Sequence, residues 1–285
     1  EERNMKRIGI IGAGTMGIDV TIDALFHEFQ VVLVDINNTA LKSAKKKIVR
    51  TLRMGTMISQ KFGNYSKDYV NEHLVITQNI DDVKKCNVIV ENICEKFEEK
   101  EKVYCRLNEI CTKDTLFVCN TSCIPITCIA KNVENPKRVI GVHFMNPAYL
   151  KTTVEVIRGY YTDDDCVGRV KKFIGQFDKK CIVVNDCPGF VSNRISHLLM
   201  NEAAYTVMDG VATVQQVDDI FKQCFGHKMG PFETADLIGI DVVVDSLDIL
   251  YECYHDSKFR CCPLFKKMVG ANLLGRKSGK GFYNY

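Results

Sequence analysis

The 285-residue sequence lacks the features of several protein classes. Its 6 prolines and 19 glycines are too few for a collagen-like or a proline-rich disordered chain. It has no apolar run of the roughly 18 residues that a membrane span needs, and no signal-peptide pattern opens it. The formal net charge of +3 is too small to indicate nucleic-acid binding. We therefore expect a cytoplasmic globular protein with no membrane or nucleic-acid partner, long enough for one large domain or two smaller ones.

The 14 cysteines include no C-x-x-C pair, which excludes the usual spacing of a zinc site. A disulfide scaffold is normally a short secreted chain, whereas this chain is long. We predict that the cysteines are reduced thiols, mostly buried, and that the protein holds no metal.

Apolar, strand-like segments alternate with helical segments as far as about residue 185. The alternation predicts an α/β fold with a doubly wound, mostly parallel sheet. After Asn185 the pattern becomes helical, so we predict a nucleotide-binding domain over residues 1–185 and an all-α domain over residues 186–285. The predicted strands cover residues 7–11, 31–34, 74–76, 87–90, 115–119, 139–142, 153–157 and 181–184.

A glycine-rich turn joins the first strand to the first helix and reads GAGTMG. In this motif Gly12 permits a tight turn, Gly14 lets the backbone approach a pyrophosphate, and Gly17 lets the helix pack closely on the strand. Asp35 ends the next strand, where a carboxylate can bond both hydroxyls of a ribose and would repel a 2′-phosphate. The unit therefore predicts a dinucleotide site that takes NAD rather than NADP.

Polar residues that could carry chemistry follow two of the later strands. Ser122 follows the strand at 115–119, and His143 follows the strand at 139–142. Ligands of doubly wound sheets bind at the carboxyl ends of the strands, so we expect both side chains to face one crevice. Glu155, on the next strand, could reach His143, orient its imidazole and raise its basicity.

Several further motifs occur in order along the chain, and together they resemble the L-3-hydroxyacyl-CoA dehydrogenases, also called 3-hydroxybutyryl-CoA dehydrogenases. The resemblance covers nearly the whole chain. It implies a Rossmann-like domain followed by a helical C-terminal domain, through which members usually form homodimers. The matching segments are GIIGAGTMG, VIVENICEKFEEK, NTSCIPIT, GVHFMNPA, VEVIRG, DCPGFVSNRI, HKMGPFETAD and GRKSGKGFYNY.

The resemblance also implies roles for individual residues. His143 would be the general base that takes a hydroxyl proton while hydride leaves C3 of a 3-hydroxyacyl thioester for NAD, and Glu155 would be its partner. Ser122 and Asn193 would bond the substrate oxygens. The positions implied for the NAD site are Gly12, Gly14, Thr15, Met16, Gly17, Asp35, Glu95, Lys100, Ser122, Asn146 and Lys277.

The chain departs from the family pattern where substrate is expected to bind. A basic helical stretch is predicted over residues 39–61, and Thr51 and Ile58 stand in it where the family would have a CoA-contacting Ser and Lys. Lys61 lies nearby and could replace the missing cation. The segment after His143 reads FMNPAYLKTTVEV and is more polar than the family pattern.

These departures resemble a branch of the family that oxidises seryl or glyceryl thioesters on an acyl carrier protein, for polyketide extender units. The basic stretch would suit an acidic carrier protein. We therefore expect a carrier-bound substrate. The alternative is 3-hydroxybutyryl-CoA of fatty-acid or butyrate metabolism.

Two other functions stay open at this point. One is an NAD-binding protein without turnover, which would not need Ser122, His143, Glu155 and Asn193 together. The other is a dehydrogenase of a free hydroxy acid, which would need an arginine to grip the carboxylate. Arg158 and Arg194 are the candidates for that arginine.

Overall fold

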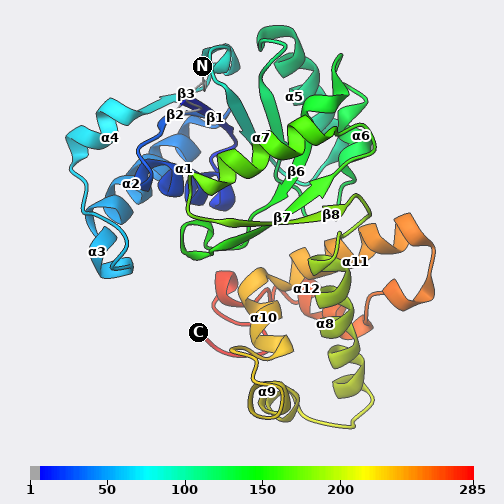
Figure 1. Ribbon diagram of the computed structural model, residues 1–285. Coiled ribbons are helices and arrows are strands. Elements are labelled where there is room, and N and C mark those ends of the chain that lie inside the picture. The colour runs from blue at the N-terminus through cyan, green and yellow to red at the C-terminus, as the bar shows by residue number, and fades with distance from the viewer. Residues whose placement is uncertain (1–6) are drawn as a thin grey trace. The chain divides into compact units, whose positions relative to one another are not determined.

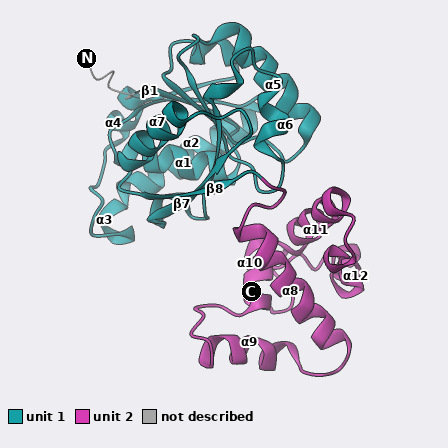
Figure 2. Ribbon diagram, turned by 45° about the vertical axis from the view of Figure 1, so that its right-hand side comes forward, with its two compact units in different colours: residues 1–186 teal, residues 187–285 magenta. Residues whose placement is uncertain are grey.

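The computed structural model of the chain describes residues 7–285 (Figure 1). The chain divides into two compact units, one ending at Asp186 and the other running from Cys187 to Tyr285 (Figure 2). The break therefore lies one residue beyond the predicted domain boundary. A hydrophobic cluster built within residues 8–177 forms the core of the first unit, and a cluster within residues 200–268 forms that of the second.

The first unit is built on one eight-stranded sheet with the order β3-β2-β1-β4-β5-β6-β7-β8. Neighbouring strands are parallel except for the antiparallel pair β6 and β7. The strands are β1 (Arg7–Ile11), β2 (Gln30–Val34), β3 (Leu74–Thr77), β4 (Val88–Glu91), β5 (Leu116–Cys119), β6 (Val139–His143), β7 (Thr153–Arg158) and β8 (Lys180–Asn185).

Helices cover both faces of this sheet, as the prediction of a doubly wound fold requires. Leu116 and Val118 of β5 join the cluster that includes residues of α1, α2 and α7, whereas Phe117 between them packs edge-on against Tyr104 of α5. Successive side chains of a strand point to opposite faces, so α5 lies on the other face. The helices are α1 (Thr15–Phe26), α2 (Asn38–Arg53), α3 (Gly55–Ile58), α4 (Lys67–His73), α5 (Phe97–Ile110), α6 (Ile126–Ala130) and α7 (Asp164–Gly175).

The central strands are buried on both faces, which explains their continuous apolar sequences. Each predicted strand agrees with an observed strand to within one residue at either end. The sequence alternation therefore identified the α/β Rossmann-like architecture correctly.

The prediction of one basic helix over residues 39–61 is wrong. Helix α2 ends at Arg53, only the short α3 follows, and α4 begins after Ser66, whose hydroxyl accepts the Tyr69 N–H at 3.1 Å. Gly55 explains the break, because a Cβ at this position would lie 2.0 Å from the carbonyl oxygen of Gly63. The chain therefore turns back on itself at residues 55–63.

The second unit consists of helices and a C-terminal tail, in agreement with the predicted all-α domain. Two buried carboxylates organise it. Asp218 accepts the N–H groups of Phe232 and Glu233, and Asp236 accepts those of Phe282 and Tyr283 at 3.0 and 2.9 Å. The tail is therefore fastened to α10. The helices are α8 (Ser192–Met208), α9 (Val214–Gln223), α10 (Pro231–Ile238), α11 (Ile240–Tyr254) and α12 (Pro263–Gly270).

All 14 cysteines are thiols, but the prediction that most of them are buried is wrong. Six are buried and five are exposed, the exposed ones lying mostly on helices that face solvent. None of the helices within residues 7–285 is long and apolar enough to cross a membrane.

Candidate active site

The glycine-rich turn between β1 and α1 is closed on one side and open on the other. Gly12 has φ +98°, and a Cβ there would lie 2.6 Å from the Asn92 carbonyl oxygen. A Cβ on Gly17 would lie 1.8 Å from the carbonyl oxygen of Gly12, so helix and strand touch at this point. A Cβ on Gly14 would meet nothing within 4 Å. Space therefore remains beside Gly14, at the amino end of α1, where backbone N–H groups favour an anion.

Asp35 stands next to this turn at the carboxyl end of β2. One of its carboxylate oxygens accepts the Ala13 N–H at 2.7 Å, and the other accepts the Asn37 N–H at 2.8 Å. Thr15 and Met16 form the first turn of α1, the former exposed and the latter half-buried. The turn, the helix terminus and the fixed carboxylate fit the pyrophosphate and ribose of NAD.

Glu95 holds the turn that carries Ser122. Its Oε1 accepts the N–H groups of Ser122 and Cys123 at 2.9 and 2.8 Å and also the hydroxyl hydrogen of Thr121. Since its side chain is 30 % exposed, Glu95 also keeps surface for a ligand. Ser122 itself is half-buried at the end of β5.

Lys100, which the family resemblance assigns to the NAD site, lies on α5, and its role in that site stays a prediction. Its side chain is fully buried, and its Nζ lies 2.8 Å from Oε1 of Glu91 and 3.8 Å from Oε2 of Glu95. Burial raises the pKa of Glu91, and the ammonium group of Lys100 partly offsets that rise. Lys100 therefore pairs with Glu91 and, at longer range, with Glu95, the residue that holds the turn of Ser122. Sequence reasoning missed Glu91, which looks like the polar end of an apolar strand.

His143 and Glu155 lie directly opposite each other in the antiparallel pairing of β6 and β7. The His143 Nδ1 is 3.2 Å from the Glu155 Oε2, and both residues are only 7 % exposed. When Nδ1 donates its proton to the carboxylate, the basic lone pair of the neutral ring is on Nε2. The arrangement suits a general base that a carboxylate orients.

The segment that follows His143 is held at both ends. Near its start, Asn120 Oδ1 accepts the Phe144 N–H at 3.3 Å. Farther along, the buried Lys179 donates to the Ala148 carbonyl oxygen at 2.8 Å and lies 3.0 Å from Asp23 Oδ2. The exposed Asn146 lies between these anchors. Sequence reasoning missed Lys179, since nothing distinguishes it from the exposed lysine that follows it.

Asn193 and Lys277 belong to the second unit. Asn193 lies in the first turn of α8, where its carbonyl oxygen faces His197 Nδ1 at 2.9 Å. Lys277 forms an ion pair with Asp241. In the first unit, Thr51 is half-buried near the end of α2.

Ile58, also in the first unit, is half-buried at the end of α3, and Lys61 is exposed beyond it. The two arginines considered for a free carboxylate already have partners. Arg158 pairs with Asp164 at 2.7 Å, and the guanidinium of Arg194 lies 4.8 Å from the ring centre of Tyr254.

Comparison with known proteins agrees with this geometry. Residues 7–187 match the family model of the 3-hydroxyacyl-CoA dehydrogenase NAD binding domain, and residues 189–285 match that of the 3-hydroxyacyl-CoA dehydrogenase C-terminal domain. The chain is 37% identical over 281 residues to a probable 3-hydroxybutyryl-CoA dehydrogenase of Bacillus subtilis, covering 99% of this chain and 98% of that one. It is 38% identical over 282 residues to a 3-hydroxybutyryl-CoA dehydrogenase of Bradyrhizobium diazoefficiens, covering 99% and 96%.

A solved structure is also similar to this chain. The crystal structure of an (S)-3-hydroxybutyryl-CoA dehydrogenase from Ralstonia eutropha matches with a TM-score of 0.90 and 32% identity, over 99% of both chains. Both family models, the relatives and the solved structure thus indicate the same family over nearly the whole chain. The chain belongs to the 3-hydroxyacyl-CoA dehydrogenase family and is an NAD-dependent oxidoreductase that acts on a CH–OH group.

Proposed function

We propose that this enzyme oxidises a short 3-hydroxyacyl-CoA ester, 3-hydroxybutyryl-CoA, to the 3-ketoacyl ester. The observation that carries the proposal is the buried pair of His143 and Glu155, fixed opposite each other on two strands. The pair stands in the same unit as the turn and carboxylate that fit NAD.

In the proposed reaction His143 takes the proton of the substrate 3-hydroxyl through Nε2. Glu155 stabilises the imidazolium that forms and keeps the ring in one orientation. The glycine-rich turn and Asp35 would hold NAD⁺, which would supply the acceptor for the hydride from C3. The hydroxyl of Ser122, on the turn that Glu95 holds, donates a hydrogen bond to the substrate oxygen as its charge grows. In the reverse direction His143 returns the proton.

The choice of a CoA ester reverses the order of the two substrates expected from the sequence. The relatives are named as dehydrogenases of 3-hydroxybutyryl-CoA, which supports the CoA ester over a carrier-bound seryl or glyceryl thioester. Thr51 and Ile58 still depart from the family pattern. We assign the cation that would face the CoA phosphates to Lys61, which is exposed three residues beyond Ile58.

We also propose that the enzyme forms a homodimer through its second unit. Support comes from large apolar side chains that this unit leaves in solvent, among them Ile195 at 63 %, Val211 at 76 % and Phe225 at 67 % exposure. Analytical ultracentrifugation measures the mass directly, and a monomer at micromolar concentration would contradict this part of the proposal.

The substitution His143→Gln tests the proposed reaction. We expect kcat for 3-hydroxybutyryl-CoA to fall by about 10²–10⁴-fold, the usual contribution of a general base, while NAD binding stays unchanged. NADH absorbance gives kcat, and fluorescence titration gives NAD affinity. The matched control is His73→Gln, at the end of α4, which should keep full activity. A His143→Gln enzyme with kcat within threefold of wild type would remove His143 from the reaction.

A further inference from the structure

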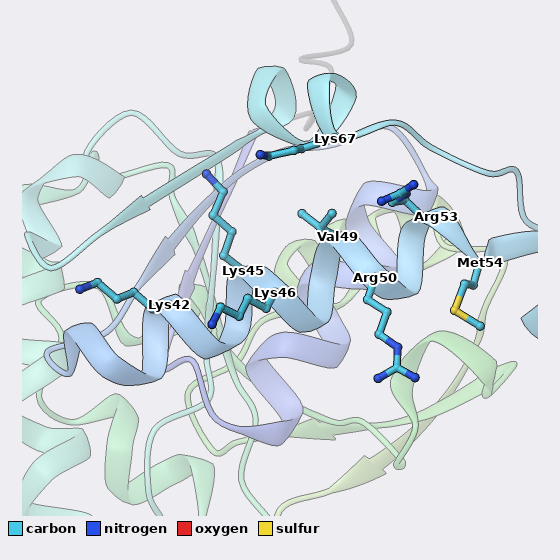
Figure 3. Close-up of a pocket in the computed structure, with 8 residues that line it drawn as sticks. All are labelled: Lys42, Lys45, Lys46, Val49, Arg50, Arg53, Met54 and Lys67. Atoms are coloured by element: carbon cyan, nitrogen blue, oxygen red, sulfur yellow. The ribbon is translucent and has the colours of Figure 1, made fainter.

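The solvent face of α2 and the start of α4 enclose a groove of about 870 Å³. Figure 3 shows Lys67 of α4 lying across from Lys45 and Val49 of α2. We call this feature the basic groove. Its lining consists of Val49 and Met54 together with six cations, Lys42, Lys45, Lys46, Arg50, Arg53 and Lys67.

The cations of the basic groove carry charge that no carboxylate within residues 7–285 pairs with. None of the six forms an ion pair with any residue in the described part of the chain, whereas Lys47 of the same helix lies 3.4 Å from Asp19. The sequence has no acidic residue between Asp35 and Asp68. Like charges at i,i+4 on a helix destabilise it, so an anionic partner would relieve repulsion that the protein alone leaves in place.

The residues of α2 and its C-cap residue Met54 form two parallel ridges in the basic groove. One is Lys45, Val49 and Arg53, and the other runs from Lys42 through Lys46 and Arg50 to Met54, both at i,i+4 spacing. Each ridge contains one apolar side chain among cations. Ridges of this spacing enclose a valley that accepts the ridge of a second helix. From Lys42 to Arg53 the helix rises roughly 16 Å, or three turns.

The ridge of Lys45, Val49 and Arg53 lies on a different side of α2 from Thr51. Two residues along an α-helix correspond to 200° of rotation, so Thr51 points roughly 160° away from Arg53. Thr51 is also half-buried, whereas Arg53 is exposed. Thr51, where the family resemblance implies a CoA contact, therefore lies on another face of α2 than this ridge.

We propose that the basic groove docks an acidic amphipathic helix of a partner protein. Three turns of unpaired cations match carboxylates repeated along a helix, and Val49 and Met54 match an apolar stripe between those carboxylates. A single phosphate group would reach only a few of the six cations and would leave the apolar side chains unused. The proposal does not depend on which thioester the enzyme oxidises.

The test uses the full-length enzyme and a fluorescein-labelled helical peptide of about 18 residues, with glutamates flanking a leucine stripe. Fluorescence anisotropy gives the affinity at low and at physiological salt. We expect Lys45→Glu/Lys46→Glu/Arg53→Glu to bind at least about tenfold more weakly, because each reversed charge turns an attraction into a repulsion. The control Lys137→Glu/Lys171→Glu/Lys172→Glu changes the net charge equally and should shift affinity less than about twofold.

Four results would overturn the proposal. Equal loss of affinity in the two triple variants would indicate attraction by net charge alone. Equally tight binding of a peptide of the same composition without the apolar stripe would show that Val49 and Met54 are not used. Displacement of the peptide by inorganic tripolyphosphate that itself binds more tightly would indicate a site for small anions. Finally, a tenfold rise in KM for 3-hydroxybutyryl-CoA in the groove variant alone would assign the groove to the substrate.

Discussion

At Asp35, two backbone N–H groups fix the carboxylate before any nucleotide binds. The Ala13 N–H belongs to the glycine-rich turn. One hydrogen bond of 2.7 Å therefore joins Asp35, the expected partner of the ribose, to the turn expected to hold the phosphates. A bound ribose therefore meets a carboxylate whose orientation is already set, which reduces the entropy lost on binding.

Substituting Asp35→Ala tests this assignment. The variant loses a charge-assisted contact worth about 1.5–3 kcal/mol, so we expect the KM for NAD to rise by about tenfold or more. The KM for NADP should fall relative to that for NAD, because the repulsion of the 2′-phosphate is gone. Initial rates with each cofactor provide both values. An unchanged KM for NAD would place the ribose elsewhere.

The sequence predicted best those site residues that belong to local motifs or to neighbouring strands. Gly12, Gly17 and Asp35 lie within one βαβ unit, and His143 and Glu155 come together because the end of β6 pairs with the start of the antiparallel β7. A buried ion pair such as the one Lys100 makes depends on packing between elements distant in sequence. The charged stretch that contains Lys100 looks like a solvated helix face, and its one buried position carries no local sign.

Helix α5 shows how an element supports the turn that carries Ser122. It brings Lys100 under Glu91 and Glu95, and Glu95 in turn holds the turn of Ser122. The carboxylate of Glu91 is fully buried and also accepts the Ile93 N–H at 2.7 Å. Removing the ammonium group would leave this carboxylate without its counter-ion in a buried position.

The Lys100→Met variant should therefore lose about 3–5 kcal/mol in the free energy of unfolding, which urea denaturation measures. The double variant Glu91→Gln/Lys100→Met should recover a substantial part of the loss, because it removes the uncompensated charge. A single variant that loses less than about 1 kcal/mol, or a double variant without recovery, would contradict the account of this pair.

His27 caps the carboxyl end of helix α1, and its Nδ1 lies 2.8 Å from the carbonyl oxygen of Asp23 and 3.4 Å from the Asp23 Oδ1. Burial lowers the pKa of His27. The hydrogen bonds to Asp23 and its charge raise that pKa by more than burial lowers it, so the net shift is upward from the ordinary 6.5. A group with a raised pKa stabilises the fold below its unfolded-state pKa and loses that contribution as the pH rises through the folded-state pKa.

We expect the wild type to be more stable than His27→Gln below about pH 6 and to lose that advantage as the pH rises toward 8. Thermal or urea unfolding of both proteins across this range gives the difference. Two stability curves that stay parallel from pH 5 to 9 would show that protonation of His27 does not contribute to stability.

The helix predicted over residues 39–61 shows why the end of an element is hard to predict. Apart from Gly55, its basic, helix-favouring composition gives no sign of the break after Arg53. The break depends on the approach of Gly55 to Gly63, a contact between two backbone segments that no local pattern encodes. The strands were predicted better, because burial on both faces leaves a continuous apolar run in the sequence.

At the scale of the whole molecule, the chain combines a nucleotide-binding unit with a helical unit, each with its own core. The change from alternating strands and helices to helices alone predicted this organisation. Substrate identity is less accessible, because it depends on a few positions such as Thr51 and Ile58, whose substitution leaves the fold and the hydride chemistry unchanged.

A comparison of substrates therefore tests which thioester the enzyme oxidises. Purified enzyme and NAD⁺ are offered 3-hydroxybutyryl-CoA and, separately, seryl- and glyceryl-loaded acyl carrier protein, and NADH absorbance is followed. We expect rapid turnover of the CoA ester that is lost in the His143→Gln variant. Turnover of only the loaded carrier protein would contradict this expectation and would restore the carrier-bound thioester as the substrate.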